Sequence, residues 1–374
     1  GARGVSLPLE GSAAGEVARQ RKPLLYVRGE AGPAWMRLPT AATIWAWLGV
    51  PLIARDRVLG VLNIDVRMPA QTGPDALPPL KRRFRERDIE VAGSFANHAA
   101  LAIENARLYQ ESVTRVEQEL EIARRIQANL FPRTLPNLPG LRIAARCLPA
   151  RETGGDFYDL VDIGPRLGVI VGDVSGKSIP AAMLMAAARS ITRSEVRNHE
   201  IPWVTLGEIN RWLVEDIPHN SFVALSYALV DTTQRRLAFA SAGQLSPMLR
   251  RADGSVSFLE SPPAMPLGID PLIEYAQIEL DLLPGDTIIF YTDGIIEAHN
   301  GQRELFGFER LEAILQCYGD KAPNELIEHI ITEVHAFSAG LPTHDDMTIV
   351  VMQMVWEGCA REPGSRASSL KHPH

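Results

Sequence analysis

Residues 154–177 read GGDFYDLVDIGPRLGVIVGDVSGK and determine the fold of the second half of the chain. Two apolar runs flank the turn residues Gly164-Pro165-Arg166, a pattern typical of a β-hairpin. If the turn is centred near Pro165, residues that face each other across the hairpin have numbers that sum to about 329 or 330. Asp156 and Asp173 sum to 329, so we expect them to lie opposite each other at the open end of the hairpin.

Two opposed aspartates create an electrostatic problem. Residues directly opposite each other in an antiparallel pair share one sheet face, with Cβ atoms about 5 Å apart. Like charges at that separation destabilise the pair unless a counterion lies between them. A divalent cation bound by Asp156 and Asp173 is the natural counterion.

A second pair of acids follows the same logic. An apolar strand predicted at 287–292 ends at Asp293, and Asp345 shortly precedes another apolar run. If these strands are antiparallel, Asp293 and Asp345 meet at one end. Any one acid at a strand end is more often merely solvated, but four in glycine-framed contexts indicate a metal site. Oxygen donors without a Cys or His cluster favour Mg²⁺ or Mn²⁺ over zinc, and two such ions about 3.5–4 Å apart can activate water and clamp a phosphate.

The remaining pattern of the second half alternates strand hairpins with paired helices. This pattern favours an α+β layered domain over a parallel Rossmann sheet. Further strands are predicted at 222–230, 235–240, 247–251, 256–260, 276–280 and 348–354, and helices at 180–196, 204–217, 308–318 and 324–337.

A long helix is predicted from about residue 86 to residue 131, because this stretch contains no proline and a single glycine. Apolar and small residues recur at alternating steps of three and four, the spacing of a coiled-coil seam. The seam consists of Ala106, Tyr109, Val113, Val116, Leu120, Ala123, Gln127 and Leu130. It predicts a parallel homodimer through the linker helix, with a single helix packed on its own domain as the open alternative.

Composition excludes several classes of protein. The 374 residues carry a formal net charge of −7, which argues against a nucleic-acid binder that depends on phosphate contacts. Hydrophobic residues make up 46%, enough for a globular core, yet no apolar run is long enough for a transmembrane helix, and no secretory leader is visible. The 3 cysteines form neither a disulfide framework nor a zinc motif. These features predict a cytoplasmic protein.

Four ordered motifs resemble those of the metal-dependent protein phosphatases, the protein phosphatase 2C superfamily, in its bacterial SpoIIE-like and RsbU-like branch. They lie at 154–159, 172–177, 291–294 and 345–348, and residues 123–132 resemble the segment that enters the domain in that branch. The resemblance covers about residues 120 to 355. It implies an α/β/β/α layered domain, in which two antiparallel sheets are flanked by helices.

The resemblance also implies roles for individual residues. Asp173 would bridge two Mn²⁺ or Mg²⁺ ions, and the backbone carbonyl of Val174 would help to hold the second ion. Asp156 would lie beside the second ion, directly or through water. Asp293 and Asp345 would hold the first ion. Asp156 and Asp173 are therefore the catalytic candidates, for hydrolysis of phosphoserine or phosphothreonine by activated water without a covalent phosphoenzyme.

Neighbouring polar residues receive more ordinary predictions. By the same resemblance, Asp346 and Asp159 order the turns of their motifs. Arg151 is a candidate for binding phosphate, although a surface ion pair is the simpler interpretation. His344 is a candidate acid, with a turn residue as the alternative.

The first 107 residues resemble the later part of a GAF sensor domain. The likeness rests on residues 49–52, 60–64 and 84–88, which lead into 99–110, and it implies a domain that lacks its earliest strand and helix. GAF domains commonly bind small ligands. Trp35, Trp45 and Trp47 either line such a pocket or belong to the core.

The predicted organisation is a GAF-like sensor domain at 1–107, a linker helix at 108–131, a phosphatase domain at 132–356 and a disordered tail at 357–374. The predicted function is a metal-dependent serine/threonine protein phosphatase regulated by the sensor. Its implied substrate is a phosphorylated STAS-type anti-sigma-factor antagonist. A non-catalytic GAF dimeric scaffold and a phosphoesterase that acts on nucleotides are the alternatives.

Overall fold

The computed structural model describes residues 9–27, 44–67, 84–177, 179–218, 220–341 and 343–355. The chain divides into two compact units, Gly1–Glu117 and Gln118–His374, and one helix contributes residues to both. The predicted disordered tail at 357–374 lies outside the described residues. No helix in the described ranges combines the length and the apolar character needed to cross a membrane.

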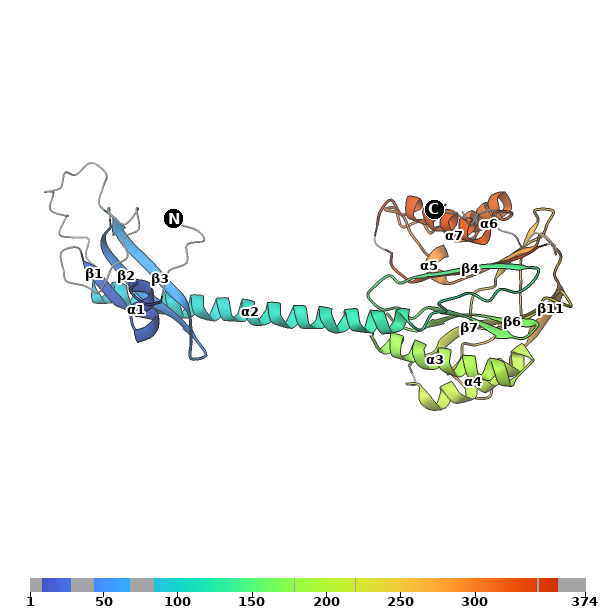
Figure 1. The fold of residues 1–374 in the computed structure, drawn as a ribbon, viewed down its shortest axis with the longest axis horizontal. Helices are drawn as coiled ribbons and strands as arrows, with labels where there is room; N and C mark the ends of the chain where they lie inside the picture. Colours follow the sequence, from blue (N-terminus) through green and yellow to red (C-terminus); the bar gives the residue numbers. More distant parts are fainter. Residues whose placement is uncertain are drawn as a thin grey trace, which may run out of the picture. The chain divides into compact units, whose positions relative to one another are not determined.

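The first unit contains a three-stranded antiparallel sheet in the order β1-β2-β3 (Figure 1). Its elements are α1 (Ala13–Gln20), β1 (Leu24–Val27), β2 (Ile44–Ala54), β3 (Arg57–Arg67) and the first part of α2 (Glu86–Ala128). The hairpin between β2 and β3 confirms the prediction made for this stretch. Arg55 and Asp56 form its turn with φ of 43° and 65°, and Ala54 pairs with Arg57.

Helix α2 confirms the long predicted helix but ends at Ala128, three residues before residue 131. Near its start, Ala92 and Ala96 are buried against Leu48 and Val50 of β2, so small side chains allow close packing of helix and sheet. Farther along, the apolar seam is open to solvent within one chain, with Tyr109 74% exposed. The exposed seam residues are Ala106, Tyr109, Val113 and Val116.

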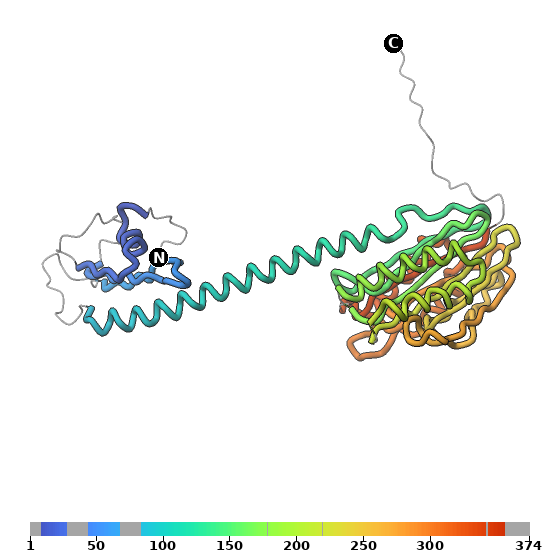
Figure 2. Tube along the Cα trace, turned by 90° about the horizontal axis from the view of Figure 1, so that it is seen from below, coloured from blue at the N-terminus to red at the C-terminus, as the bar shows by residue number. Residues whose placement is uncertain are grey.

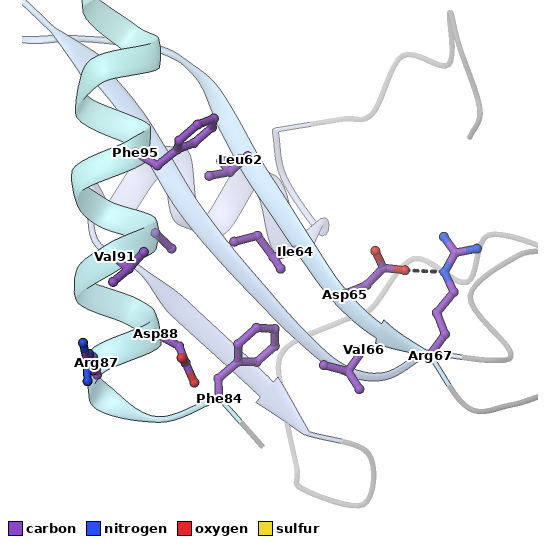
Figure 3. A pocket seen from close by; sticks show the side chains of 11 residues that line it. Leu62, Ile64, Asp65, Val66, Arg67, Phe84, Arg87, Asp88, Val91 and Phe95 are labelled. Carbon is purple, nitrogen blue, oxygen red and sulfur yellow. Dashed lines mark hydrogen bonds and ion pairs between the residues drawn. The ribbon is translucent and has the colours of Figure 1, made fainter. Parts of the chain in front are cut away.

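A cavity of about 730 Å³ lies between β3 and the start of α2 (Figure 3). Leu62, Phe84 and Phe95 are among the side chains that line it. Trp45 and Trp47 do not line this cavity. Trp47 is buried, with its ring 5.7 Å from that of Tyr26, as expected of a core residue. The third predicted tryptophan, at position 35, lies outside the described residues.

The second unit contains two five-stranded antiparallel sheets, which confirms the predicted layered α+β fold (Figure 1). The strand orders are β10-β9-β12-β13-β4 and β11-β8-β7-β6-β5. The strands are β4 (Leu141–Leu148), β5 (Phe157–Ile163), β6 (Arg166–Val174), β7 (Val223–Asp231), β8 (Arg236–Ala242), β9 (Met248–Arg250), β10 (Val256–Phe258), β11 (Gln277–Asp281), β12 (Thr287–Tyr291) and β13 (Met347–Met354).

Helices cover the outer face of each sheet. Helices α3 and α4 lie side by side across the sheet that contains β6 and β7 (Figure 2), whereas α5 to α7 cover the other sheet. The helices are α3 (Ile179–Asn198), α4 (Pro202–Asp216), α5 (Asp293–Ile296), α6 (Gly307–Tyr318) and α7 (Pro323–Phe337). The result is a four-layer α/β/β/α arrangement.

Strand β6 shows why the sequence forms these layers. Leu167, Val169 and Val171 point into the core between the two sheets. The intervening Ile170 and Val174 point into the core beneath α3 and α4. Because successive side chains alternate between faces and both faces are buried, the strand is apolar almost throughout. The charged exceptions are Arg166 at the start of the strand and Asp173 near its end, where the candidate site forms.

Candidate metal centre

Asp156 and Asp173 meet as the hairpin arithmetic predicts. Phe157 pairs with Gly172 across β5 and β6, so the register sum is 329, and Asp156 comes immediately before the first paired residue. Asp156 is 2% exposed. Burial first, and then the charge of Asp173, raises the pKa of Asp156 well above its usual range.

Asp173 lies in a field of negative charge. Burial is the largest cause of its raised pKa, which is about 7, followed by the charges of Asp293, Asp345 and Asp346. A hydrogen bond with Asp156 acts in the opposite direction. A carboxyl group whose pKa is raised by burial and then by neighbouring carboxylates is well suited to receive a cation.

The second predicted pair also comes together. Strands β12 and β13 are antiparallel, with Tyr291 opposite Ile349, so Asp293 follows one strand at the end where Asp345 precedes the other. The pKa of Asp293 is raised by burial and then by the charge of Asp345. Four acids from two sheets therefore converge at one end of the layered domain.

The carbonyl of Val174 lies beside the same group of acids. A Cβ atom built on Gly155 would lie 2.4 Å from the Val174 oxygen and 3.2 Å from Oδ1 of Asp173. No side chain fits at position 155, because two oxygen atoms already converge there. Glycine at this position keeps open the space between the carbonyl and the carboxylate.

Asp346 orders the loop that carries Asp156, whereas the prediction placed its role in the turn of its own motif. Its Oδ1 accepts a hydrogen bond from the backbone of Ala150 at 2.7 Å, and its Oδ2 accepts one from Gly155 at 2.8 Å. A Cβ atom on Gly154 would collide with this carboxylate. The carboxylate of Asp346 thus joins the loop before β13 to the loop before β5.

The prediction for Asp159 was wrong. Its carboxylate is buried and forms ion pairs with Arg189 at 2.9 Å and with Arg193 at 2.8 Å, both on α3. It fixes a helix against strand β5 and does not order a turn. The local sequence could not reveal this, because Arg189 and Arg193 lie about 30 residues farther along the chain and are brought close to Asp159 only by tertiary packing.

Thr292 is a site residue that the sequence reasoning missed. Its buried hydroxyl donates to Oδ2 of Asp156 at 2.6 Å and accepts from the backbone of Thr348 at 2.9 Å. Thr292 follows β12 and Asp156 precedes β5, so this side chain links the two sheets at the site. The sequence did contain one signal for this role, because Thr292 directly precedes the predicted metal ligand Asp293.

Gln127 has a role different from the one its heptad position predicted. Its amide donates to the carbonyl of Gly154 at 2.6 Å and accepts from the Gly154 backbone N–H at 3.1 Å. The side chain is buried, and Leu130 packs on the core beneath α3 and α4. The last two seam residues therefore attach the end of α2 to the second unit, and Gln127 holds a residue two positions before Asp156.

Basic residues lie at the edge of the acids. Lys177 Nζ is 2.6 Å from Oδ2 of Asp345 and donates to the carbonyl of His344 at 2.9 Å. Arg151 donates to the carbonyl of Lys177 at 3.4 Å, so its observed contact is to the backbone of that loop. The His344 ring stacks on the His299 ring, with centroids 4.2 Å apart. His344 lies in a loop, in keeping with the alternative prediction of a turn residue.

The donor set fits a hard divalent cation. Carboxylate and carbonyl oxygens are the ligands that Mg²⁺ and Mn²⁺ prefer. Burial first, and then the charges of neighbouring acids, raise the pKa values of Asp156, Asp173 and Asp293, and a cation would relieve the repulsion between them. Among the described residues, no three His, Cys, Asp or Glu side chains are arranged as a ready-made ligand set. The acids are close enough to repel one another, but they would have to converge further to share an ion.

The fold and the sequence both resemble known phosphatases. The family model of stage II sporulation protein E (SpoIIE) matches residues 164–355, more than half of the chain, and a GAF domain model matches residues 2–104. The chain is 26% identical over 253 residues to phosphoserine phosphatase RsbU of Bacillus subtilis (strain 168), covering 66% of this chain and 74% of RsbU. Phosphoserine phosphatase RsbP of the same organism is 23% identical over 248 residues, covering 65% of this chain and 59% of RsbP.

Solved structures share the architecture of the second unit. The SiaA-PP2C domain of Pseudomonas aeruginosa matches with a TM-score of 0.59 and 24% identity, covering 65% of this chain and 98% of that domain. The RsbU and RsbW domains of a Mycobacterium tuberculosis protein match with a TM-score of 0.50 and 28% identity, covering 59% of this chain and 62% of that one. The chain therefore belongs to the SpoIIE family, with a protein phosphatase 2C fold in its second unit and a GAF domain before it.

Proposed function

We propose that this chain is a divalent-metal-dependent phosphatase that hydrolyses phosphoserine or phosphothreonine on a signalling protein in the cytoplasm. The observation that carries the proposal is the convergence of Asp156, Asp173, Asp293 and Asp345 from the ends of strands in two sheets. Family membership and the names of RsbU and RsbP as phosphoserine phosphatases support the reaction class.

In this proposal Asp173 would help to hold two Mn²⁺ or Mg²⁺ ions. Asp293 and Asp345 would hold the first ion, and the carbonyl of Val174 would help to hold the second, with Asp156 beside it directly or through water. When bound, the ions would supply an activated water and positive charge for the phosphoryl oxygens. The protein's own contribution is to hold the ligands, because a carboxylate oriented by hydrogen bonds binds metal better than a mobile one. Thr292 does this for Asp156.

The proposed substrate is a phosphorylated STAS-type anti-sigma-factor antagonist, and the finer parts of this assignment rest on likeness to the family. The direct support is that the two Bacillus relatives are named as phosphoserine phosphatases. A nucleotide phosphoesterase is the competing enzyme class. A GAF scaffold with a degenerate phosphatase domain is the non-catalytic alternative, and the presence of all four acids speaks against it.

We further propose that residues 1–107 form a sensor, residues 108–131 a linker helix and residues 132–356 the catalytic domain. The exposed seam of Tyr109, Val113 and Val116 supports a homodimer through the linker helix. The cavity beside Phe84 and Phe95 offers room for a small apolar ligand in the GAF domain (Figure 3). In this proposal the helix transmits the state of the sensor to the catalytic domain. Equal activity of isolated 132–356 and of the full chain, at every protein concentration and ligand tried, would refute this transmission.

A substrate panel tests the proposed activity. Phosphate release is measured with Mn²⁺ from an aryl phosphate, from nucleotides and from phosphoserine proteins, each repeated with a chelator. Metal-dependent turnover of a phosphoserine protein is expected. Turnover of nucleotides alone would support the competing enzyme class, and no metal-dependent turnover of any substrate would support the scaffold.

A further inference from the structure

Lys177 lies at the point where the first metal ion of the proposed centre would bind. We propose that the Lys177 ammonium and a divalent metal ion compete for the carboxylate of Asp345, so that Lys177 sets the metal affinity of the site. This inference rests on the proposed metal-dependent function and extends it to a residue with no assigned role.

The contact of Lys177 is specific. Its Nζ is 2.6 Å from Oδ2 of Asp345 and also donates to the carbonyl of His344 at 2.9 Å. Lys177 belongs to the loop after β6, four residues beyond Asp173, whereas Asp345 lies two residues before β13 of the other sheet. The lysine therefore reaches from one half of the candidate site to the other. Its charge also lowers the pKa of Asp293, against the larger effect of burial.

Ammonium and metal cannot share this carboxylate oxygen without repulsion. Metal–oxygen bonds of Mg²⁺ are about 2.0–2.1 Å long. An ion bound to Asp345 would therefore lie within a few ångströms of Nζ, where like charges repel strongly. Metal binding at Asp345 thus requires Lys177 to move away.

The structure provides a place for the displaced side chain. A cavity of about 280 Å³ adjoins the contact and is lined by Lys177, Asp345, Glu297 and His299, among others. Glu297 offers the ammonium a second carboxylate within this cavity. Lys177 can consequently leave the carboxylate of Asp345 and still have an acidic neighbour.

Binding of Mn²⁺ alone to the full chain tests the competition. Free Mn²⁺ is followed by electron paramagnetic resonance during titration of the wild type, Lys177→Met and Lys177→Arg. Removing the competing charge in Lys177→Met should tighten one Mn²⁺ site by about three- to tenfold, in keeping with the strength of a partly exposed ion pair plus the relief of repulsion. Lys177→Arg keeps the charge and should bind within about twofold of wild type.

Arg151→Met is the matched control, because it removes a positive charge that contacts the backbone of the same loop without touching Asp345. Equal tightening in this variant would show a long-range charge effect and overturn the competition. Thermal unfolding with and without Mn²⁺ verifies folding, and Mn²⁺ should raise the Tm of Lys177→Met more than that of wild type. Unchanged or weaker Mn²⁺ binding by folded Lys177→Met refutes the inference alone, whereas absence of Mn²⁺ binding to wild type refutes the proposed metal-dependent function.

Discussion

Replacing Gln127 with alanine removes the side chain that attaches the end of α2 to the loop before Asp156. The substitution deletes two hydrogen bonds, at 2.6 and 3.1 Å, and both involve the backbone of Gly154. The donor and acceptor of Gly154 then lie in a buried environment without the amide that satisfied them. A buried polar group that loses its partner costs about 1–3 kcal/mol.

We therefore expect Gln127→Ala to lower the free energy of unfolding of the second unit by about 1–3 kcal/mol, or roughly 2–4 °C in Tm per kcal/mol. The loop that carries Asp156 should also become less ordered, so Mn²⁺ affinity should fall in the same variant. Differential scanning calorimetry and Mn²⁺ titration measure the two effects on the full chain.

Gln110→Ala is the matched control, because Gln110 is an exposed glutamine on the same helix. It should leave both stability and Mn²⁺ affinity near wild type. If Gln127→Ala unfolds at the wild-type temperature and binds Mn²⁺ as tightly, the amide contributes nothing and the coupling of α2 to the site is refuted.

Three further predictions concern the groups around the metal centre. Thr292→Val removes the hydroxyl that donates to Asp156 and should weaken Mn²⁺ binding by about 1–3 kcal/mol, and recovery in Thr292→Ser would separate loss of the hydrogen bond from loss of packing. Asp159→Asn leaves Arg189 and Arg193 facing a neutral group and should lower the free energy of unfolding in urea by about 2–4 kcal/mol. This is less than the full cost of breaking a buried pair because Arg193 is partly exposed. An effect below about 0.5 kcal/mol would contradict this. In chelator, the free energy of unfolding should fall as pH rises from about 4 to about 7. The reason is that the folded state keeps the proton on Asp173 to about pH 7, whereas the unfolded state releases it near 3.8. A Tm that rises over this window, or a pH slope of stability that is unchanged in Asp173→Asn, would contradict the pKa assignment.

The sequence predicted those parts of the fold that depend on short-range patterns. The hairpin of β5 and β6 follows from the predicted turn at 164–166, although in the structure Arg166 already pairs with Ile163. A tight turn fixes the register of every later pair, including the position of Asp156 relative to Asp173. Helix α2 was predicted for a comparable reason, since 43 residues without a proline leave little alternative to a helix.

Contacts between distant parts of the chain could not be predicted from the sequence. Gln127 satisfies a heptad spacing, and nothing local distinguishes a seam residue from one that packs on Gly154. Asp159 lies within a phosphatase motif, but its partners Arg189 and Arg193 become neighbours only when α3 covers the sheet. Thr292 required the juxtaposition of two sheets before its hydroxyl could reach Asp156. In each case the missing information was tertiary packing.

The most direct measurement of the central claim is Mn²⁺-dependent phosphate release from a phosphoserine protein by wild type, Asp173→Asn and Asp162→Asn. Asp162 is an exposed aspartate at the other end of the same hairpin, where it accepts a hydrogen bond from Gly164. Wild type and Asp162→Asn should turn over in Mn²⁺ and stop in chelator, and folded Asp173→Asn should lose at least about a hundredfold in rate. Full activity of Asp173→Asn, or wild-type turnover that persists in chelator, would contradict a carboxylate-held metal centre.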